Sequence, residues 1–310
     1  MPGQIQLIPL EKILNYYKLE AAVLNKSLIP KLDWYRINLL IELALKEDIE
    51  TGDATTIAVV PENIEIEAKL VTRETCVCAG LPIAEAVFKK LDYGIKWNPK
   101  ANEGDLLQQG DILASMNGSA RAILTTERTA LNFIQRISGI ATASYKYAAA
   151  VSGTSTKILD TRKTTPGWRN VEKYAVAIGG STNHRMGLYD RIMIKDNHRI
   201  IAGLEGEGGI LRSVEKSRKK YPQLEIEVEA DSLDEFREAL KSGAEYILLD
   251  NMTNEQMAEA VKINNGQARL EASGGITLER IPSIAALGVD FISVGALTHS
   301  VRAIDISLEM

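Results

Sequence analysis

The second half of the chain alternates short apolar strands with amphipathic helices. Strands are predicted at residues 157–160, 191–195, 224–229, 246–250, 268–273 and 290–295. The last four end at polar or small residues 21 to 23 positions apart, at Glu229, Asp250, Ser273 and Gly295. Strict alternation indicates a parallel sheet covered by helices. The even spacing favours a βα barrel, and a doubly wound open sheet is the alternative that spacing alone leaves open.

Capping signals mark the helices between the later strands. Ser232-Leu-Asp-Glu235 and Thr253-Asn-Glu-Gln256 each place a hydroxyl at an N-cap, with an acid or amide three residues later. Gly243 and Gly288 are expected to end helices, because glycine readily adopts the left-handed conformation found after a helix.

The first half of the chain has a different pattern. Residues 1–33 are interpreted as an N-terminal extension, in which residues 10–24 have the spacing of an amphipathic helix. Residues 34–150 are expected to form a domain with a helix at 35–46, a strand at 64–71, a helix at 81–91 and a long connecting helix at about 125–151. Residues 151–310 would form the barrel domain, with the last residues packing back on the first domain.

Composition limits the function. The formal net charge of −5 argues against a broad nucleic-acid-binding surface. No apolar run is long enough to span a bilayer, so we expect no membrane partner and a cytoplasmic location. Cys76 and Cys78 have neither redox nor zinc spacing and are interpreted as small buried side chains.

Ionisable or small residues stand at the end of each predicted strand. In a βα barrel the active site lies at the carboxyl ends of the strands. These positions are Asp160 with Arg162 and Lys163, then Lys195, Glu229, Asp250, Ser273 and Gly295. We therefore predict a site at this edge, whereas Arg169, Lys173 and Arg191 are interpreted as solvated side chains on helix faces.

Two parts of this edge have the residues of an anion site and a cation site. Ser273-Gly-Gly-Ile-Thr277 is predicted to run from a strand into a helix, and Val294-Gly-Ala-Leu297 follows the last strand, so their backbone N–H groups would face phosphate. Glu229 and Asp250 on neighbouring strands would share a Mg²⁺ ion, with Glu227 as a further candidate ligand. The alternative is that these acids pair with the lysines and arginines of the site.

The three histidines, His184, His198 and His299, all fall in or beside these segments. Their position suggests binding or proton handling, their spacing does not suggest zinc, and His184 is the strongest candidate.

Several ordered motifs resemble quinolinate phosphoribosyltransferase. They are Glu127-Arg-Thr-Ala-Leu-Asn132, Ser138-Gly-Ile-Ala-Thr142, Asp160-Thr-Arg-Lys-Thr-Thr-Pro-Gly167, Asn183-His-Arg185, Ile194-Lys-Asp-Asn-His198, Glu227-Val-Glu229, Leu249-Asp-Asn-Met252 and Glu271-Ala-Ser-Gly-Gly-Ile276. The similarity extends from about residue 33 to the C-terminus. Because many separated motifs occur in the right order, it is far more specific than any single one.

The resemblance implies an α/β protein with an N-terminal α/β sandwich domain followed by an open, seven-stranded βα barrel. It implies transfer of phosphoribosyl from phosphoribosyl pyrophosphate to quinolinate with decarboxylation, giving nicotinate mononucleotide for NAD biosynthesis. Mg²⁺ is the expected cofactor, and no organic cofactor is needed. The expected assembly is a homodimer with shared active sites, and a higher oligomer is left open.

The resemblance also implies residue roles. The basic pocket for the two quinolinate carboxylates would contain Arg128, Arg162, Lys163, His184, Arg185 and Lys195, with Arg128 supplied by the neighbouring subunit. Glu229 and Asp250 would face ribose and Mg²⁺, and phosphate would be held by Ser273, Gly274 and Gly295. Catalysis is assigned to Lys163, Lys195, Glu229 and Asp250.

The chain departs from the family pattern before Asn183. Bacterial members commonly have Gly-Gly-Gly-His where this chain has Gly179-Gly-Ser-Thr182, and an arginine where it has Ala177. This departure puts the local loop shape in doubt, and not the reaction.

Three alternatives stay open. A nicotinate phosphoribosyltransferase would need room for only one carboxylate. A barrel aldolase would use Lys195 as a Schiff-base nucleophile in an apolar pocket. A metabolite-binding relative without activity would be expected to lack a charged residue at a strand end, and none is missing.

Overall fold

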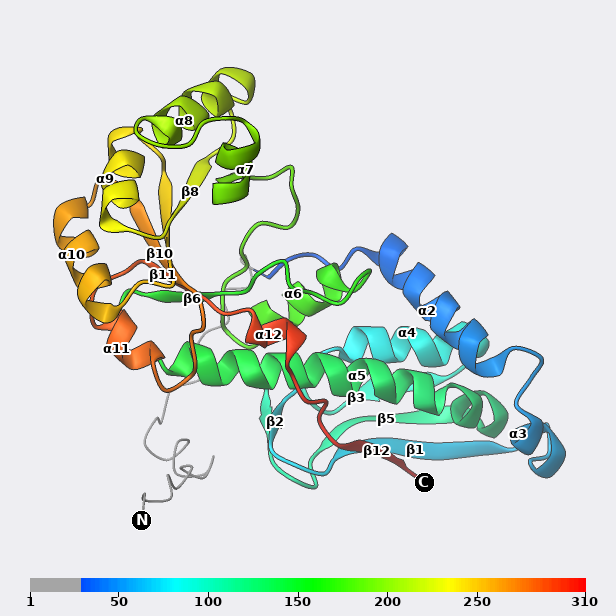
Figure 1. Ribbon diagram of the computed structural model, residues 1–310. Helices are drawn as coiled ribbons and strands as arrows, with labels where there is room; N and C mark the ends of the chain where they lie inside the picture. The colour runs from blue at the N-terminus through cyan, green and yellow to red at the C-terminus, as the bar shows by residue number, and fades with distance from the viewer. Residues whose placement is uncertain (1–28) are drawn as a thin grey trace, which may run out of the picture.

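The computed structural model describes residues 29–310, which form an antiparallel part and a parallel part (Figure 1). The helix predicted at residues 10–24 lies outside the described residues. The antiparallel part contains, in chain order, α2 (Trp34–Ile49), α3 (Ala54–Val59), β1 (Glu65–Thr72), β2 (Cys76–Val77), α4 (Leu81–Leu91), β3 (Lys96–Pro99), β4 (Leu106–Leu107), β5 (Ile112–Ser119) and α5 (Ala120–Ala149).

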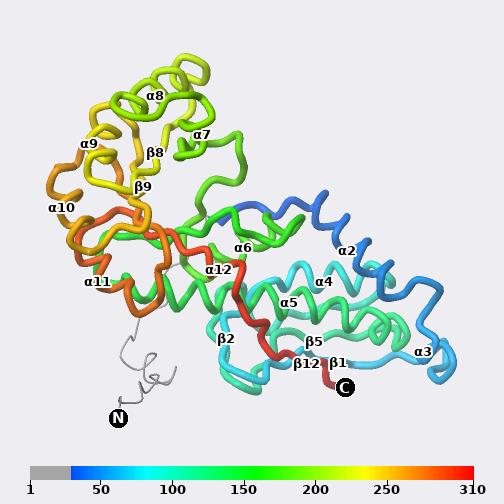
Figure 2. Tube along the Cα trace, viewed as in Figure 1, coloured from blue at the N-terminus to red at the C-terminus, as the bar shows by residue number. Residues whose placement is uncertain are grey.

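One antiparallel sheet organises this part, in the strand order β12-β1-β5-β3. The edge strand β12 (Ile306–Glu309) comes from the other end of the chain and pairs with β1, with Ile306 opposite Thr72. The C-terminus therefore lies beside the first sheet, as the trace in Figure 2 shows. Cys76 and Cys78 are both fully buried here, as the sequence predicted.

The long helix α5 connects this sheet to the parallel part (Figure 1). It begins five residues before the predicted position, because the Ser119 hydroxyl accepts the N–H of Ala122 and caps the helix at Ala120. Small residues on α5 allow close contacts: a side chain at Gly139 would collide with the backbone carbonyl of Arg302. The segment that leads to β12 therefore packs directly on this helix.

The parallel part contains all six predicted strands. Its elements are β6 (Lys157–Leu159), α6 (Arg169–Ile178), β7 (Ile192–Ile194), α7 (Asp196–Ile201), α8 (Gly209–Lys220), β8 (Ile226–Ala230), α9 (Leu233–Lys241), β9 (Tyr246–Asp250), α10 (Asn254–Asn264), β10 (Arg269–Ser273), α11 (Ile281–Ala285), β11 (Phe291–Ser293) and α12 (Ala296–His299). Residues 246–249 of β9 are all buried, as expected of a strand covered on both sides.

The strand order β6-β11-β10-β9-β8-β7 is that of an open barrel. Seven strands were expected, and six form the parallel sheet. The seventh position is a single parallel bridge between Leu159 and Thr182, next to β6. Since Thr182 and β7 are not paired, the barrel opens between them.

The predicted caps are present, with one correction. Ser232 caps α9 through the N–H of Glu235, and Thr253 and Gln256 form a capping box on α10. The prediction of a helix directly after Thr277 is wrong. Turns occupy residues 278–280, and α11 begins at Ile281 and is only 5 residues long. None of the helices in residues 29–310 is long and apolar enough to cross a membrane.

Candidate active site

A cavity of about 900 Å³ lies at the carboxyl ends of the parallel strands. It brings together all but one of the residues to which the family resemblance assigned roles, whereas Asp160, which the sequence also placed at this edge, does not line it. Those that line it are Arg162, Lys163, His184, Arg185, Lys195, Glu229, Asp250, Ser273, Gly274 and Gly295. The exception is Arg128, which lies on α5.

One side of the cavity carries positive charge without acidic partners. Neither Arg162 nor Arg185 forms an ion pair with residues 29–310, and Nε of Arg162 is buried without a hydrogen-bond partner. Arg185 is held by donating to the carbonyl of Arg191 at 2.9 Å. Burial, and then the positive charge of Arg162, lower the pKa of Arg185. Two guanidinium groups kept close together without an ion-pair partner among the described residues are suited to bind an anionic ligand.

Lys163 lies beside these arginines, on the loop after β6. Its carbonyl accepts a hydrogen bond from the Thr298 hydroxyl at 2.7 Å, which ties the loop to α12. Its side chain passes over Gly295, where an added Cβ would lie 3.0 Å from Cδ of Lys163. Gly295 therefore leaves room for the lysine at the cavity.

The cavity is also lined by acids at the ends of β8 and β9. In the paired strands β8 and β9, Glu229 lies opposite Leu248, and Asp250 follows two residues later on the same face. Glu229 forms an ion pair with Nζ of Lys195. For Glu229, the structure therefore shows the alternative arrangement, in which an acid pairs with a lysine of the site. Asp250 has no cationic partner within residues 29–310 and accepts a hydrogen bond from Nδ2 of Asn251 at 2.8 Å. Two carboxylates on adjacent strands fit a Mg²⁺ ion that is also held by ligand phosphates.

The Gly-Gly turn after β10 packs closely against Asn251. Gly274 has a φ of 93°, and a Cβ there would collide with the side chain of Asn251, which itself has a φ of 55°. The backbone N–H of Asn251 donates to the carbonyl of Ser273 at 3.0 Å. Backbone groups of this turn face the cavity, and no helix N-terminus adds to them, since α11 begins later.

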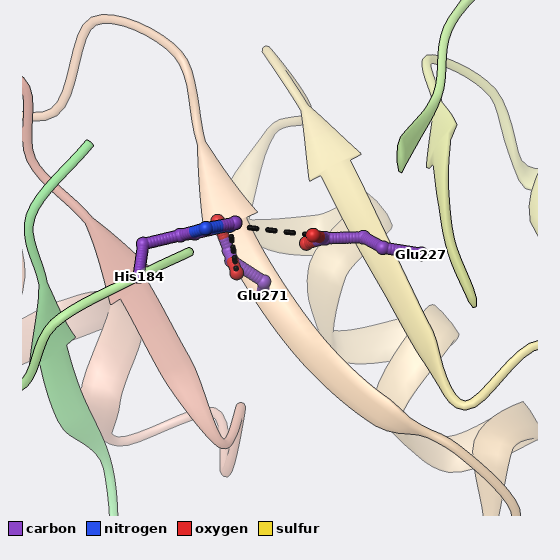
Figure 3. Close-up of side chains that lie close together, drawn as sticks. All are labelled: His184, Glu227 and Glu271. Atoms are coloured by element: carbon purple, nitrogen blue, oxygen red, sulfur yellow. Dashed lines mark ion pairs between the residues drawn. The ribbon is translucent and has the colours of Figure 1, made fainter. Parts of the chain in front are cut away.

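His184 lines the cavity, and its ring lies between two buried acids, Glu227 and Glu271 (Figure 3). Its Nε2 is 3.3 Å from Oε2 of Glu227 and 3.4 Å from Oε2 of Glu271. Burial lowers the pKa of His184, but the two carboxylates outweigh this effect and raise it to about 9. Glu227 contacts His184 and Arg191, so it belongs to this cluster and not to the Glu229 and Asp250 pair.

These three side chains have the composition of a metal site, but the hydrogen bonding argues against one. The two carboxylates face Nε2 of His184 and raise the pKa of the ring, so they hold a proton on Nε2. A metal ligand would need the lone pair of Nε2, with a proton on Nδ1 that is donated to an acceptor. The cluster therefore anchors the histidine ring.

The interpretation of three basic residues as solvated side chains is wrong. Lys173 is fully buried and pairs with Asp160. Arg191 is mostly buried and stacks over the Tyr246 ring, with 3.9 Å between Cζ and the ring centroid. Arg169 is half-buried and donates to the carbonyl of Met186 at 3.0 Å. All three support the loop that carries His184 and Arg185, or the strand beside it.

The other two histidines are exposed. His299 lines the cavity next to Gly295, and Nδ1 of His198 accepts the backbone N–H of Lys195 at 3.0 Å. Residues that the sequence did not single out also line the cavity, among them Asn251, Glu271 and Ser293. The available signal was strand alternation, because Glu271 precedes Ser273 by two residues and so shares its face.

The segment that departs from the family pattern packs against α5. A side chain at Gly179 would collide with the carbonyl of Ala141, and the Ser181 hydroxyl donates to the carbonyl of Ser144 at 3.2 Å. Thr182 forms the bridge to β6. Residues 179–182 therefore pack closely on α5 just before the Asn183–Arg185 loop.

Arg128 is exposed on α5 and outside the cavity. Within residues 29–310 it forms no ion pair, so pairing with an acid on its own helix is not observed. Its guanidinium is available to another molecule.

The chain matches two family models. Residues 53–138 match "Quinolinate phosphoribosyl transferase, N-terminal domain", and residues 140–309 match "Quinolinate phosphoribosyl transferase, C-terminal domain".

Known proteins similar to this chain carry related names. A probable nicotinate-nucleotide pyrophosphorylase (carboxylating) of Bacillus subtilis is 42% identical over 265 residues, which cover 85% of this chain and 90% of that protein. A chloroplastic nicotinate-nucleotide pyrophosphorylase (carboxylating) of Arabidopsis thaliana is 42% identical, covering 89% and 83%. The solved structure of the nicotinate-nucleotide pyrophosphorylase from Francisella tularensis is 40% identical with a TM-score of 0.85, covering 91% of this chain and 98% of that one.

Proposed function

Because the chain belongs to the quinolinate phosphoribosyltransferase family, we propose that its barrel edge joins quinolinate to phosphoribosyl pyrophosphate. The products are nicotinate mononucleotide, pyrophosphate and CO₂, and the reaction supplies NAD biosynthesis. The observation that carries this proposal is that one cavity is lined both by two arginines that form no ion pair with the described residues and by two carboxylates, Glu229 and Asp250. The arginines suit a dianionic ring, and the carboxylates suit a metal-bound sugar phosphate.

Quinolinate binds on the cationic side in this account. Arg162 and Arg185 offer planar pairs of N–H donors that match carboxylates, and Lys163 adds a point charge. His184 adds further positive charge, since the acids beneath it favour its protonated form. Because nicotinate has only one carboxylate, it would leave part of this charge without a partner.

Phosphoribosyl pyrophosphate binds on the acidic side. Glu229 and Asp250 would hold the ribose and a Mg²⁺ ion, and the ion would supply positive charge to the pyrophosphate leaving group. Ser273, Gly274 and Gly295 hold the 5′-phosphate through backbone and hydroxyl groups. Lys195 pairs with Glu229 in the structure, and it would turn its charge to quinolinate once the metal and the sugar engage Glu229.

The reaction forms a C–N bond and a C–H bond, and it breaks a C–O bond and a C–C bond. The ring nitrogen attacks the anomeric carbon of ribose, and the bond from that carbon to pyrophosphate breaks. Positive charge develops on the sugar, where Glu229 and Asp250 stabilise it. The ribosylated nitrogen is cationic, so it stabilises the carbanion left at the adjacent carbon when that carboxylate departs as CO₂. The carbanion then takes up a proton. Lys163 and Lys195 act by binding the carboxylates and holding the ring for attack.

The active unit is a homodimer with shared sites in this proposal. Arg128 is exposed and makes no ion pair with the described residues, which fits a side chain that completes the cavity of a neighbouring subunit. Exposed apolar side chains on α2, including Tyr35, Leu39 and Leu43, offer a surface for such a contact. A C₂ dimer would use the same contact twice.

The alternatives fit the cavity less well. An aldolase would need Lys195 in an apolar pocket, and here it pairs with Glu229. A non-catalytic relative would be expected to have lost one of the charged residues at the strand ends, and these residues are present.

The test is an assay of the purified chain with phosphoribosyl pyrophosphate, Mg²⁺ and either quinolinate or nicotinate. We expect nicotinate mononucleotide from quinolinate, much slower turnover of nicotinate at equal concentration, and loss of activity in excess EDTA. Equal or faster turnover of nicotinate would refute the substrate assignment. Full activity with EDTA would refute the metal role of the two acids.

A further inference from the structure

A buried ion pair lies directly behind the loop that carries His184 and Arg185. Both Asp160, which follows β6, and Lys173, which lies on α6, have side chains with no exposed surface. The Asp160 carboxylate accepts hydrogen bonds from Nζ of Lys173, from Nδ2 of Asn183 at 2.6 Å and from the backbone N–H of His184 at 2.8 Å. None of these groups lines the cavity except His184.

The pair holds the backbone of His184 from both sides. Asp160 accepts its N–H, and Lys173 donates to its carbonyl at 2.9 Å. Asn183 is fixed in the same way, since its Nδ2 also donates to the carbonyl of Lys173 at 2.9 Å. The backbone N–H and the carbonyl of His184 are both bonded to this one ion pair. The pair therefore fixes the orientation of the His184 backbone, and with it the direction of the side chain.

The position of this loop explains why such support is needed. Thr182 is paired with β6, but the barrel is open between Thr182 and β7. Residues 183–185 therefore have no neighbouring strand on the open side to accept or donate backbone hydrogen bonds. Elsewhere at the cavity, Lys195, Glu229 and Asp250 stand at the ends of strands held by regular ladders. At the opening of the barrel, the ion pair provides the backbone hydrogen bonds that neighbouring strands provide at the other positions.

We propose that Asp160 and Lys173 are positioning residues, which clamp the Asn183–Arg185 loop and so place His184 and Arg185 to bind the carboxylates of the substrate. Neither touches the substrate itself. Stability alone explains this ion pair poorly, because the cost of removing two charges from water offsets much of their attraction. The functional half of this proposal rests on the proposed binding of quinolinate, and the structural half does not.

The test uses the double variant Asp160→Asn/Lys173→Met, which removes both charges at nearly constant volume. This choice avoids leaving one buried charge alone, a change that commonly prevents folding. The matched control is Tyr174→Phe on the same helix, which loses the partly buried hydrogen bond from Tyr174 to Glu103 in the first domain.

The first readout is hydrogen exchange of the peptide that covers residues 181–187, without any ligand. We expect exchange at least about tenfold faster in the folded double variant, and exchange within about twofold of the native rate in Tyr174→Phe. Unchanged exchange in the double variant would overturn the proposal. So would equally fast exchange in the control, because loop placement would then depend on the general packing of α6.

The second readout is the dissociation constant of each substrate for the same proteins. We expect the double variant to bind quinolinate at least about tenfold more weakly, with binding of phosphoribosyl pyrophosphate changed by less than about twofold. Equal weakening of both ligands, or of neither, would overturn the positioning role. If the native chain binds no quinolinate while the exchange result holds, the proposed function fails and the clamp stands.

Discussion

His184 combines contacts that determine both its position and its charge. Its backbone is held by Asp160 and Lys173, and its ring lies between Glu227 and Glu271. Ser293 donates to the other oxygen of Glu271, so that acid is fixed in turn. The site thus obtains a positively charged group on the substrate side from negative charge buried on the opposite side.

This arrangement predicts the titration of His184. Its pKa of about 9 lies above the ordinary 6.5, so the ring keeps its charge at neutral pH and loses it as the pH rises through about 9. The variant Glu271→Gln removes one carboxylate, and the midpoint should move down toward the ordinary value. Nitrogen NMR of ¹⁵N-histidine-labelled protein measures it, with only three histidines to assign.

The control is Glu235→Gln, an acid paired with Arg199. It should leave the His184 midpoint unchanged. A midpoint at or below 6.5 in the native protein would contradict the account of the cluster.

At this scale, residues at strand ends were predictable and those that support them were not. Lys195, Glu229 and Asp250 could be placed because parallel strands all end at one edge. Lys173 was misjudged because α6 is buried almost all round, and a lysine among its residues gives no sign of its partner Asp160. Such a pair depends on contacts between segments that local sequence patterns do not contain.

At the scale of elements, the last strand links the end of the chain to the first domain. Ile306 on β12 is 2% exposed, and its carbonyl accepts a hydrogen bond from Nε2 of Gln135 on α5 at 2.7 Å. The strand β12 therefore contacts both the first sheet and α5, the helix that carries Arg128.

Ile306→Ala should accordingly lower the free energy of unfolding by about 2 to 5 kcal/mol, the usual cost of truncating a buried aliphatic side chain. Urea unfolding measures this change. Glu309→Ala on the same strand removes only an exposed ion pair with Arg73 and should cost less than about 1 kcal/mol. Equal effects of the two variants would show that β12 does not contribute through its buried face.

Element prediction succeeded where periodicity was strong. All six strands of the parallel sheet and the helix at residues 81–91 were predicted from alternation and capping. Two features were missed for related reasons. The residues after Thr277 form turns before a short helix, and the seventh strand is reduced to Thr182. Each covers too few residues for a period to appear.

At the scale of the whole molecule, we propose that a second subunit completes the site. Mixing the inactive variants Arg128→Ala and Arg185→Ala after reversible dissociation tests this. In a mixed dimer, one site keeps its own Arg185 and receives the partner subunit's Arg128, while the other site lacks both. Random reassortment should restore about a quarter of all sites. No recovery in verified mixed dimers would show that both arginines serve a site within one chain.

The central claim is that one cavity couples phosphoribosyl transfer to loss of a particular carboxylate. The most direct measurement follows quinolinate labelled with ¹⁴C in either carboxylate, in the presence of phosphoribosyl pyrophosphate and Mg²⁺. We predict labelled CO₂ only from the carboxylate next to the ring nitrogen, in equal amount to pyrophosphate, because only that carbanion is adjacent to the ribosylated nitrogen. Pyrophosphate release without CO₂, or label lost from the other carboxylate, would contradict the account.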